Sequence, residues 1–406
     1  MNANAGNRGE VAVIALVGYA HAVSHFFHLM IPPLFPWLMK DFDLSFTEAG
    51  FLMTVFFVVS GTGQALAGFV VDRVGARPVL FSGVLLLILS GLALAVAQNY
   101  PMLLLAAALA GAGNSVFHPA DFTLLNHRVS VSRLGHAFSV HGLSGNLGWA
   151  AAPLLMTTVA VFGGWRMAGL AAALVGVVAL LLLFAGRDLL AVTPANAASA
   201  GGEPAHALVT AGSAAGFLRS GAVWLCFSFF LLSTAAFGAL QNYSTASLQN
   251  IYALSLASAA SCLIAYLLGG AGGIVVGGFI AMRQAQDRII ACGLSTAAGI
   301  ALLLAAGLAP GWAVLPLMTV MGACVGIAGP SRDLLVRKAA TQGLGKASFG
   351  RVYGFVYSGL DVGLALAPLI FGPLMDGGHF NALWLGVALL QGLAVISALR
   401  VGRRAR

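Results

Sequence analysis

The sequence predicts an all-α protein that crosses a membrane twelve times and folds as two pseudo-symmetric six-helix bundles. Of its 406 residues, 60% are hydrophobic and 8% are charged, whereas a soluble domain carries roughly a quarter charged residues. Apolar runs of the length that spans a bilayer, about 20 residues, recur along the whole chain. Two short patterns of the first half also return in the second half.

The spans are separated by short polar segments or by Gly and Pro. Each run is long enough for a membrane helix and too long for a typical strand. In order, we place the twelve spans at 11–37, 46–71, 77–98, 101–126, 134–160, 164–185, 220–241, 251–281, 288–308, 311–335, 348–374 and 380–400.

The longest segment between spans, 186–219, is rich in Ala, Gly and Ser and contains Pro194 and Pro204. Such a composition is typical of a flexible linker. We therefore expect an N-terminal bundle over 1–185, a cytoplasmic linker over 186–219 and a C-terminal bundle over 220–406.

The basic residues predict the topology, because cytoplasmic loops are enriched in Lys and Arg. With both termini in the cytoplasm, all of the 20 basic residues fall in inside segments except Lys40, Arg166 and Arg332. The net charge of +8 is then an orientation signal, and no nucleic-acid partner is expected. The four cysteines show no CxxC spacing, so they predict packing residues rather than disulfides or a cofactor site.

An internal repeat pairs equivalent helices of the two halves. The segment "GAGNSVFHP" (111–119) matches "GACVGIAGP" (322–330), and "NLGWAAAPLL" (146–155) matches "DVGLALAPLI" (361–370). Both pairs are offset by a little over 210 residues, which joins span four to span ten and span five to span eleven. The repeat is therefore parallel, as in the two halves of a duplicated transporter.

The segment "GFVVDRVGARP" (68–78) joins spans two and three. Gly75 predicts a tight turn, and the pattern resembles the signature loop of the major facilitator superfamily. That resemblance implies a cytoplasmic gate in which Asp72 accepts hydrogen bonds from a helix N-terminus of the second half and pairs with Arg77 or Arg128, with Arg73 beside it. The alternative is an ordinary positively charged loop with a turn. Arg332 and Asp333 in span ten are further gate candidates, or else a structural ion pair.

A closer resemblance rests on the histidine-rich first span, on "SVFHP" in span four and on "GHAFSVHGLSGNLGWAAAPLL" (135–155). These segments resemble the fosmidomycin-resistance branch of the same superfamily. The branch implies a proton-driven, twelve-helix exporter of small, often anionic compounds in the bacterial inner membrane. Where that branch carries Glu directly after "FHP", this chain has Ala120, with Asp121 next.

Three histidines of span one, in "HAVSHFFH", form a stripe. His21, His25 and His28 fall within an arc of roughly 60° on a helix, and imidazoles at membrane depth face a cavity or neighbouring helices rather than lipid. They either line the substrate cavity or stay neutral and form hydrogen bonds with neighbouring helices. Our preferred interpretation has no bound metal, since a metal site would need further ligands from His118 or Asp121.

Span four carries His118 before Pro119, which frees a carbonyl and kinks the helix, and then Asp121. An ionisable group inside a membrane is a functional candidate. We assign proton coupling to His21, His118 and Asp121; the alternative for Asp121 is a structural pair with Arg128. The expected substrate cavity comprises His21, His25, His28, Asn114, His118, His141, Asn146, Tyr357 and Asp361.

The function predicted from these features is secondary active transport by alternating access, coupled to protons and exporting a small amphiphilic or anionic compound, as a monomer. No GxxxxGK[ST] motif is present, which argues against ATP hydrolysis, and no nucleophile–base arrangement indicates an enzyme. Alternatives are proton-coupled uptake of an organic anion, or transport of a metal or metal chelate through the histidine-lined cavity.

Overall fold

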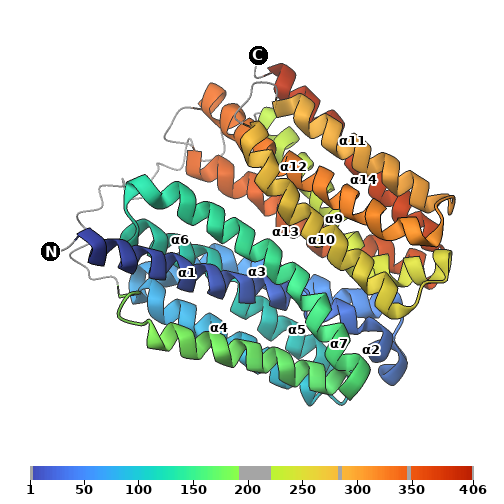
Figure 1. Cartoon of the computed structure of the whole chain (residues 1–406), viewed down its shortest axis with the longest axis horizontal. Helices are drawn as coiled ribbons and strands as arrows, with labels where there is room; N and C mark the ends of the chain where they lie inside the picture. Colours follow the sequence, from blue (N-terminus) through green and yellow to red (C-terminus); the bar gives the residue numbers. More distant parts are fainter. Residues whose placement is uncertain (1–2, 192–220, 282–285, 345–348, 405–406) are drawn as a thin grey trace. The chain divides into compact units, whose positions relative to one another are not determined.

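A computed structural model describes residues 3–191, 221–281, 286–344 and 349–404, and all regular elements in these ranges are helical. The chain divides into two compact units, Met1–Gly201 and Gly202–Arg406, called unit 1 and unit 2 below. Figure 1 draws unit 1 in blue to green and most of unit 2 in yellow to red. Most of the predicted linker lies outside the described residues, so its boundaries stay a prediction.

Unit 1 is built from seven α-helices and one 3₁₀ turn in its described part. In chain order these are α1 (Ala3–His28), η1 (Pro32–Leu34), α2 (Phe35–Phe42), α3 (Phe46–Val74), α4 (Ala76–Ala95), α5 (Tyr100–Asn114), α6 (Phe117–Arg128) and α7 (Val131–Ala185).

Unit 2 contains six described helices. They are α9 (Gly221–Tyr252), α10 (Leu256–Ala281), α11 (Gln286–Ala305), α12 (Gly311–Leu344), α13 (Phe349–Asp376) and α14 (Phe380–Arg404).

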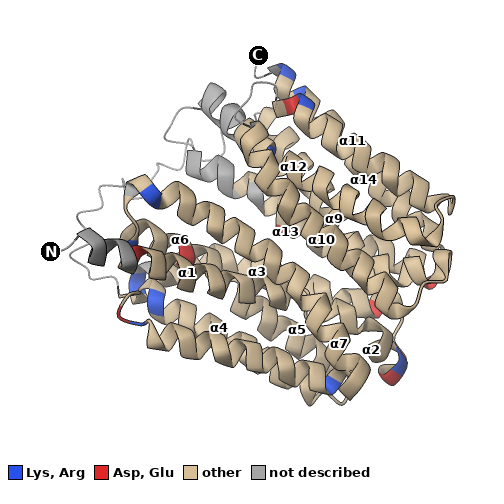
Figure 2. Cartoon of the chain, in the orientation of Figure 1, with Lys and Arg blue, Asp and Glu red and all other residues tan. Residues whose placement is uncertain are grey.

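Eleven helical segments of the described chain are long and apolar enough to cross a membrane. One of them, Ser132–Ala185, has 54 residues, although about 20 suffice for one crossing. Gly164 inside it has φ +79° and ψ 167°, outside the helical region, so the chain turns there between two spans. The count of spans is thus twelve, as the sequence predicts. Figure 2 shows the charged residues mainly near helix ends.

Two predicted spans of unit 1 are broken helices. The first span is interrupted after His28, where Pro32 and Pro33 follow in η1 before α2 continues. The fourth span breaks between Asn114 and Phe117, so that α5 and α6 are separate. Pro119 has no N–H to bond the carbonyl of Ser115, which favours a break one turn earlier. The break places Asn114 and His118 at helix ends rather than in a continuous helix.

The tight turn predicted at Gly75 is present. Gly75 has φ +94°, and its N–H donates to the carbonyl of Val71 at 2.8 Å, which ends α3 directly before α4 begins. The end predicted for the seventh span, at residue 241, is wrong, because α9 continues to Tyr252. The side chains of Asn242 and Tyr243 are buried there and bond to the carbonyls of Gly238 and Pro368, so this polar segment packs inside unit 2.

Glycines let helices of unit 2 approach to backbone contact. A Cβ built on Gly322 of α12 would collide with the carbonyl of Tyr266 in α10, and one on Gly273 of α10 would collide with the carbonyl of Ala323. Small residues that allow close backbone approach are the usual contacts between membrane helices. The pair α10 and α12, which lie side by side in Figure 1, is held in this way.

Candidate functional site: a buried histidine cluster

Five histidines of unit 1 gather at one place. We call them the histidine cluster: His21, His25 and His28 from α1, His118 from the first turn of α6, and His141 from α7. All but the partly buried His118 are buried, with exposed fractions of 8% or less. The stripe predicted on span one therefore faces the interior of the unit.

The imidazole rings are in direct contact. The ring centroids of His21 and His141 are 3.5 Å apart in a stacked arrangement, and those of His21 and His25 are 4.3 Å apart. His28 stacks on His25 at 4.7 Å, and the ring of His118 lies 5.4 Å from that of His21. The cluster is continuous, so a change at one ring affects its neighbours.

Asn114 is the polar centre on one side of the cluster. Its Oδ1 accepts hydrogen bonds from the Ser24 hydroxyl at 2.5 Å and from His28 Nε2 at 2.7 Å. Its Nδ2 donates to the Ser60 hydroxyl at 2.6 Å. One amide at the end of α5 thus satisfies polar groups from α1 and α3, which replaces the bonds that water would otherwise supply.

Asp121 forms an ion pair or hydrogen bond with His141, whose Nε2 lies 3.1 Å from Asp121 Oδ2. The Asp121 side chain is fully buried. The alternative pair with Arg128 does not form in this structure, because the Arg128 guanidinium donates to the Leu189 carbonyl at 2.7 Å. A carboxylate and an imidazole in contact at membrane depth are able to exchange and hold a proton.

Two further hydrogen bonds orient the imidazoles. His21 Nδ1 donates to the backbone carbonyl of His141 at 2.8 Å, and His118 Nδ1 donates to Gln64 Oε1 at 2.9 Å. In a neutral imidazole the second nitrogen then carries a lone pair. In both rings this nitrogen is Nε2.

Several residues of the site were not predicted. Ser24, Ser60 and Gln64 complete its hydrogen bonds, and Gly145 of α7 lies against it: a Cβ built there would approach ring atoms of His21 and His25 to 2.8 Å. The Trp149 ring is 4.4 Å from that of His25. Ser24 lies between histidines of the predicted stripe, and Gln64 is an amide within span two, so these two polar positions were available as signals in the sequence.

Other predicted cavity residues lie elsewhere. Asn146 donates to the carbonyl of Gly142 in its own helix at 2.9 Å. Asp361 is partly buried in α13 of unit 2, and the side chain of Tyr357 lies outside the described residues. Their membership in a common cavity with the histidine cluster therefore stays a prediction.

Two basic residues of the predicted gate, Arg77 and Arg128, contact the segment that follows α7. Arg77 donates to the Arg187 carbonyl at 3.2 Å, close to the Leu189 carbonyl that binds Arg128. Arg73 is exposed, and the side chain of Asp72 lies outside the described residues. The described contacts join the start of α4 and the end of α6 to residues 187–189 within unit 1.

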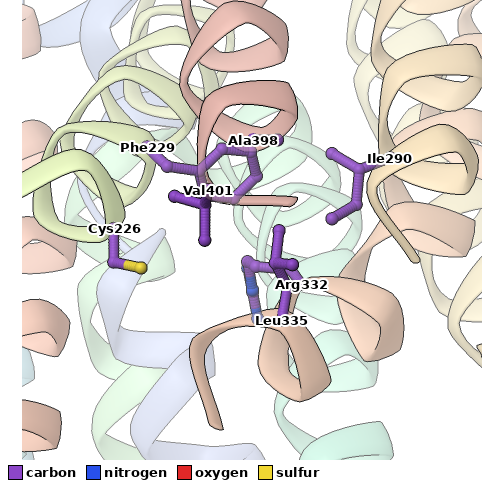
Figure 3. A pocket seen from close by; sticks show the side chains of 7 residues that line it. All are labelled: Cys226, Phe229, Ile290, Arg332, Leu335, Ala398 and Val401. Carbon is purple, nitrogen blue, oxygen red and sulfur yellow. The ribbon is translucent and has the colours of Figure 1, made fainter. Parts of the chain in front are cut away.

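Arg332 lines a small pocket inside unit 2, shown in Figure 3. Its guanidinium carbon lies 4.8 Å from the centroid of the Phe230 ring, a cation–π contact. The side chain of Asp333 lies outside the described residues. The other lining residues are Cys226, Phe229, Ile290, Leu335, Ala398 and Val401.

An apolar groove of unit 1 runs between α1 and α7. Tyr19, Phe26, Leu147 and Leu154 are among the side chains that line it. None of the residues predicted for the substrate cavity lines this groove, so it is separate from the histidine cluster.

Comparison with known protein families identifies the family of this chain. The family model of the Major Facilitator Superfamily matches residues 17–368. The chain belongs to this superfamily. The family and its fold are those of transporters, not enzymes, and the chain is a multi-pass membrane protein.

Relatives of the chain include a fosmidomycin resistance protein from Escherichia coli, 28% identical over 290 residues that cover 70% of this chain and 68% of that protein. A probable nitrate/nitrite transporter from Mycobacterium tuberculosis is 26% identical and covers 98% of both chains. The structure resembles that of a bacterial homologue of the human lysosomal transporter Spinster, with TM-score 0.73, 14% identity and coverage of 98% and 96%. The predicted resemblance to the superfamily and to its fosmidomycin-resistance members is thus confirmed.

Proposed function

We propose that this transporter is a proton-coupled exporter of a small amphiphilic or anionic compound, working by alternating access as a monomer in a bacterial inner membrane, with both termini in the cytoplasm. The observation that carries the proposal is the contact between Asp121 and His141 inside unit 1, next to His21 and His118. These groups hold a proton in one state of the transport cycle and release it in the other.

The histidine cluster suits this role because its members couple to one another. Protonation of one imidazole places a positive charge beside neighbouring rings, so it changes their hydrogen bonds and repels further protons. Those rings belong to α1, α6 and α7, and the proton state therefore biases how these helices pack. A transporter needs such a link between an ion and a helix arrangement.

In this proposal the substrate contacts come from both units. His25, His28, Asn114, Asn146, Tyr357 and Asp361 contribute to the cavity, while Asp72, Arg73, Arg77, Arg128, Arg332 and Asp333 belong to the cytoplasmic gate. Support for an anionic or drug-like substrate comes from the relatives, one named for resistance to fosmidomycin and one for nitrate and nitrite. The first of these names also supports our proposal of a role in drug resistance by efflux.

The alternative is proton-coupled uptake of an organic anion. Uptake and export use the same groups and differ in which side binds the substrate. The nitrate-related member keeps this alternative open, since its similarity covers nearly the whole chain.

The test is transport by the purified protein in liposomes, with labelled fosmidomycin and labelled nitrate as the two probes. In an exporter, an inward proton gradient drives at least one probe out of right-side-out vesicles against its gradient, and collapse of the proton gradient with an ionophore stops it. Uphill movement in the opposite direction would establish uptake instead. Absence of proton-dependent transport for both probes would overturn the proposed anionic substrate class.

A further inference from the structure

Several imidazole nitrogens of the histidine cluster are buried without a hydrogen-bond partner among the described residues. They include both ring nitrogens of His25 and Nε2 of His21. A buried polar atom that loses water and gains no partner destabilises the folded state. At His25 this free-energy cost applies to both ring nitrogens. A ligand that accepts lone pairs from several of these rings would remove much of the cost.

The hydrogen bonds already described leave a lone pair on Nε2 of His21 and on Nε2 of His118. His21 and His118 each donate through Nδ1, to the His141 carbonyl and to Gln64 Oε1. In metal sites, a ligating histidine usually donates its other nitrogen to a carbonyl, carboxylate or similar acceptor, which fixes the tautomer. Both rings therefore donate through Nδ1 as metal-ligating histidines do, and their Nε2 lone pairs can bind a metal.

We propose that His21, His25 and His118 bind one divalent transition-metal ion, such as Zn²⁺. One nitrogen of each ring lies within 4.8 Å of the others. Nitrogen ligands of a tetrahedral zinc ion, each about 2.0–2.1 Å from the metal, lie about 3.4 Å apart. Rotations of the imidazoles close the remaining gap of up to about 1.4 Å. Imidazole is a preferred ligand of zinc, copper and nickel, and three histidines leave a fourth position for water or an anion.

The surroundings fit a cation. Asp121, fully buried, contacts His141, and the His141 carbonyl in turn accepts from His21. The carboxylate offsets part of the charge that a metal ion brings into a buried site. The Trp149 ring and Gly145 cover His25 from α7, which shields the site from water. Bound metal would tie α1 to α6.

This inference goes beyond the proposed function, and its test needs neither the transported compound nor a proton gradient. A metal ion and a proton compete for the Nε2 lone pairs of His21 and His118, so bound metal would leave the proton to Asp121 and His141. It also departs from the interpretation preferred from the sequence, which had no bound metal. The difference arises because His118 comes from another span, and only the fold shows that its ring reaches those of α1.

The test uses the full chain in detergent, purified through a tag without histidines and stripped of metal with a chelator. Co²⁺ is the probe, because its visible absorption bands report tetrahedral nitrogen coordination, and Zn²⁺ should displace it. We expect one Co²⁺ per chain. His25→Ala and His118→Ala should each weaken binding at least 10-fold, as is typical for a lost ligand, whereas His136→Ala, which removes an exposed histidine, should bind as the wild type does.

A second variant guards against misfolding. His25→Cys should retain the bound Co²⁺ and add a thiolate-to-cobalt charge-transfer band in the near ultraviolet. Absence of tetrahedral Co²⁺ in the wild type, equal binding by His25→Ala, or absence of that band in His25→Cys would each overturn the proposal. Because these measurements involve no gradient and no transported compound, a failure of the transport proposal leaves them unaffected.

Discussion

Span four and span ten are equivalent in the internal repeat, yet they differ in what they do. Gly111 and Gly322 occupy matching positions, and a Cβ on either would collide with a backbone carbonyl, of Phe56 in α3 or of Tyr266 in α10. In the alignment of the two repeats, Asn114 corresponds to Val325, and His118 corresponds to Gly329. The two units thus share the packing contact and differ in the polar chemistry.

The backbone differs as well. Span four breaks before Pro119, whereas α12 runs without interruption through the equivalent Pro330. Proline alone therefore does not decide the break. Span four also has Asn114 and Ser115, and the Ser115 hydroxyl bonds the Ala112 carbonyl at 2.7 Å. Polar side chains that compete for backbone groups favour a helix end, so the functional residues of unit 1 help to shape the helix that carries them.

Substitution of the matched glycines Gly111 and Gly322 tests whether each unit depends on the same kind of close helix contact. Gly111→Ala and Gly322→Ala should each destabilise the protein by about 3 kcal/mol, because a backbone carbonyl cannot move aside as a side chain can. Thermal unfolding in detergent measures this. As controls, Gly142→Ala and Gly272→Ala add a methyl group that, apart from the adjacent residues and the backbone of its own helix, meets no described atom within 4 Å. A small effect at only one of the two matched positions would show that the packing is not shared.

The next effect tests the difference in chemistry. Asn114→Val places in span four the residue of span ten and removes the partner of Ser24, His28 and Ser60. We expect a loss of about 2 kcal/mol, since buried polar groups are left unpaired. Val325→Ala, at the equivalent position, should cost about 1 kcal/mol. If Asn114→Val were as stable as the wild type, the hydrogen bonds of Asn114 would make no net contribution to the stability of the fold.

A smaller effect concerns Gly145, which lies against the histidine cluster. Gly145→Ala should displace the rings of His21 and His25 at a cost of about 1 kcal/mol, since side chains yield more readily than backbone. The ring shift is measurable by NMR of labelled histidines. Gly142→Ala, one turn away on the same helix, is the matched control. Unchanged histidine signals in Gly145→Ala would contradict the contact.

Much of the fold follows from local patterns in the sequence. Apolar runs predict the spans, and the repeat predicts two related halves, because length and periodicity are properties of one segment. The turn at Gly75 follows in the same way. The extension of α9 to Tyr252 does not, since Asn242 and Tyr243 look like a polar helix end until their partners Gly238 and Pro368 are known.

The site is predictable only in part, because contacts between different helices cannot be read from the sequence of one segment. The stripe of His21, His25 and His28 is a property of one helix and is visible as a spacing. The contact of Asp121 with His141, rather than with Arg128, depends on how α6 and α7 pack. Gly145 illustrates this further: one glycine in "GNLG" gives no sign that two imidazoles lie against it.

In the proposed transport cycle the ionisable groups of unit 1 carry the proton, while Asp361 of unit 2 contacts the substrate. The most direct measurement compares Asp121→Asn and His21→Ala with Asp361→Asn in liposomes, using labelled fosmidomycin or nitrate, whichever the wild type transports. Asp121→Asn and His21→Ala should reduce proton-driven accumulation at least 10-fold, as expected for loss of a proton carrier, and leave gradient-free exchange of the probe intact. Asp361→Asn should weaken both. Wild-type accumulation and proton movement in both Asp121→Asn and His21→Ala would contradict the claim.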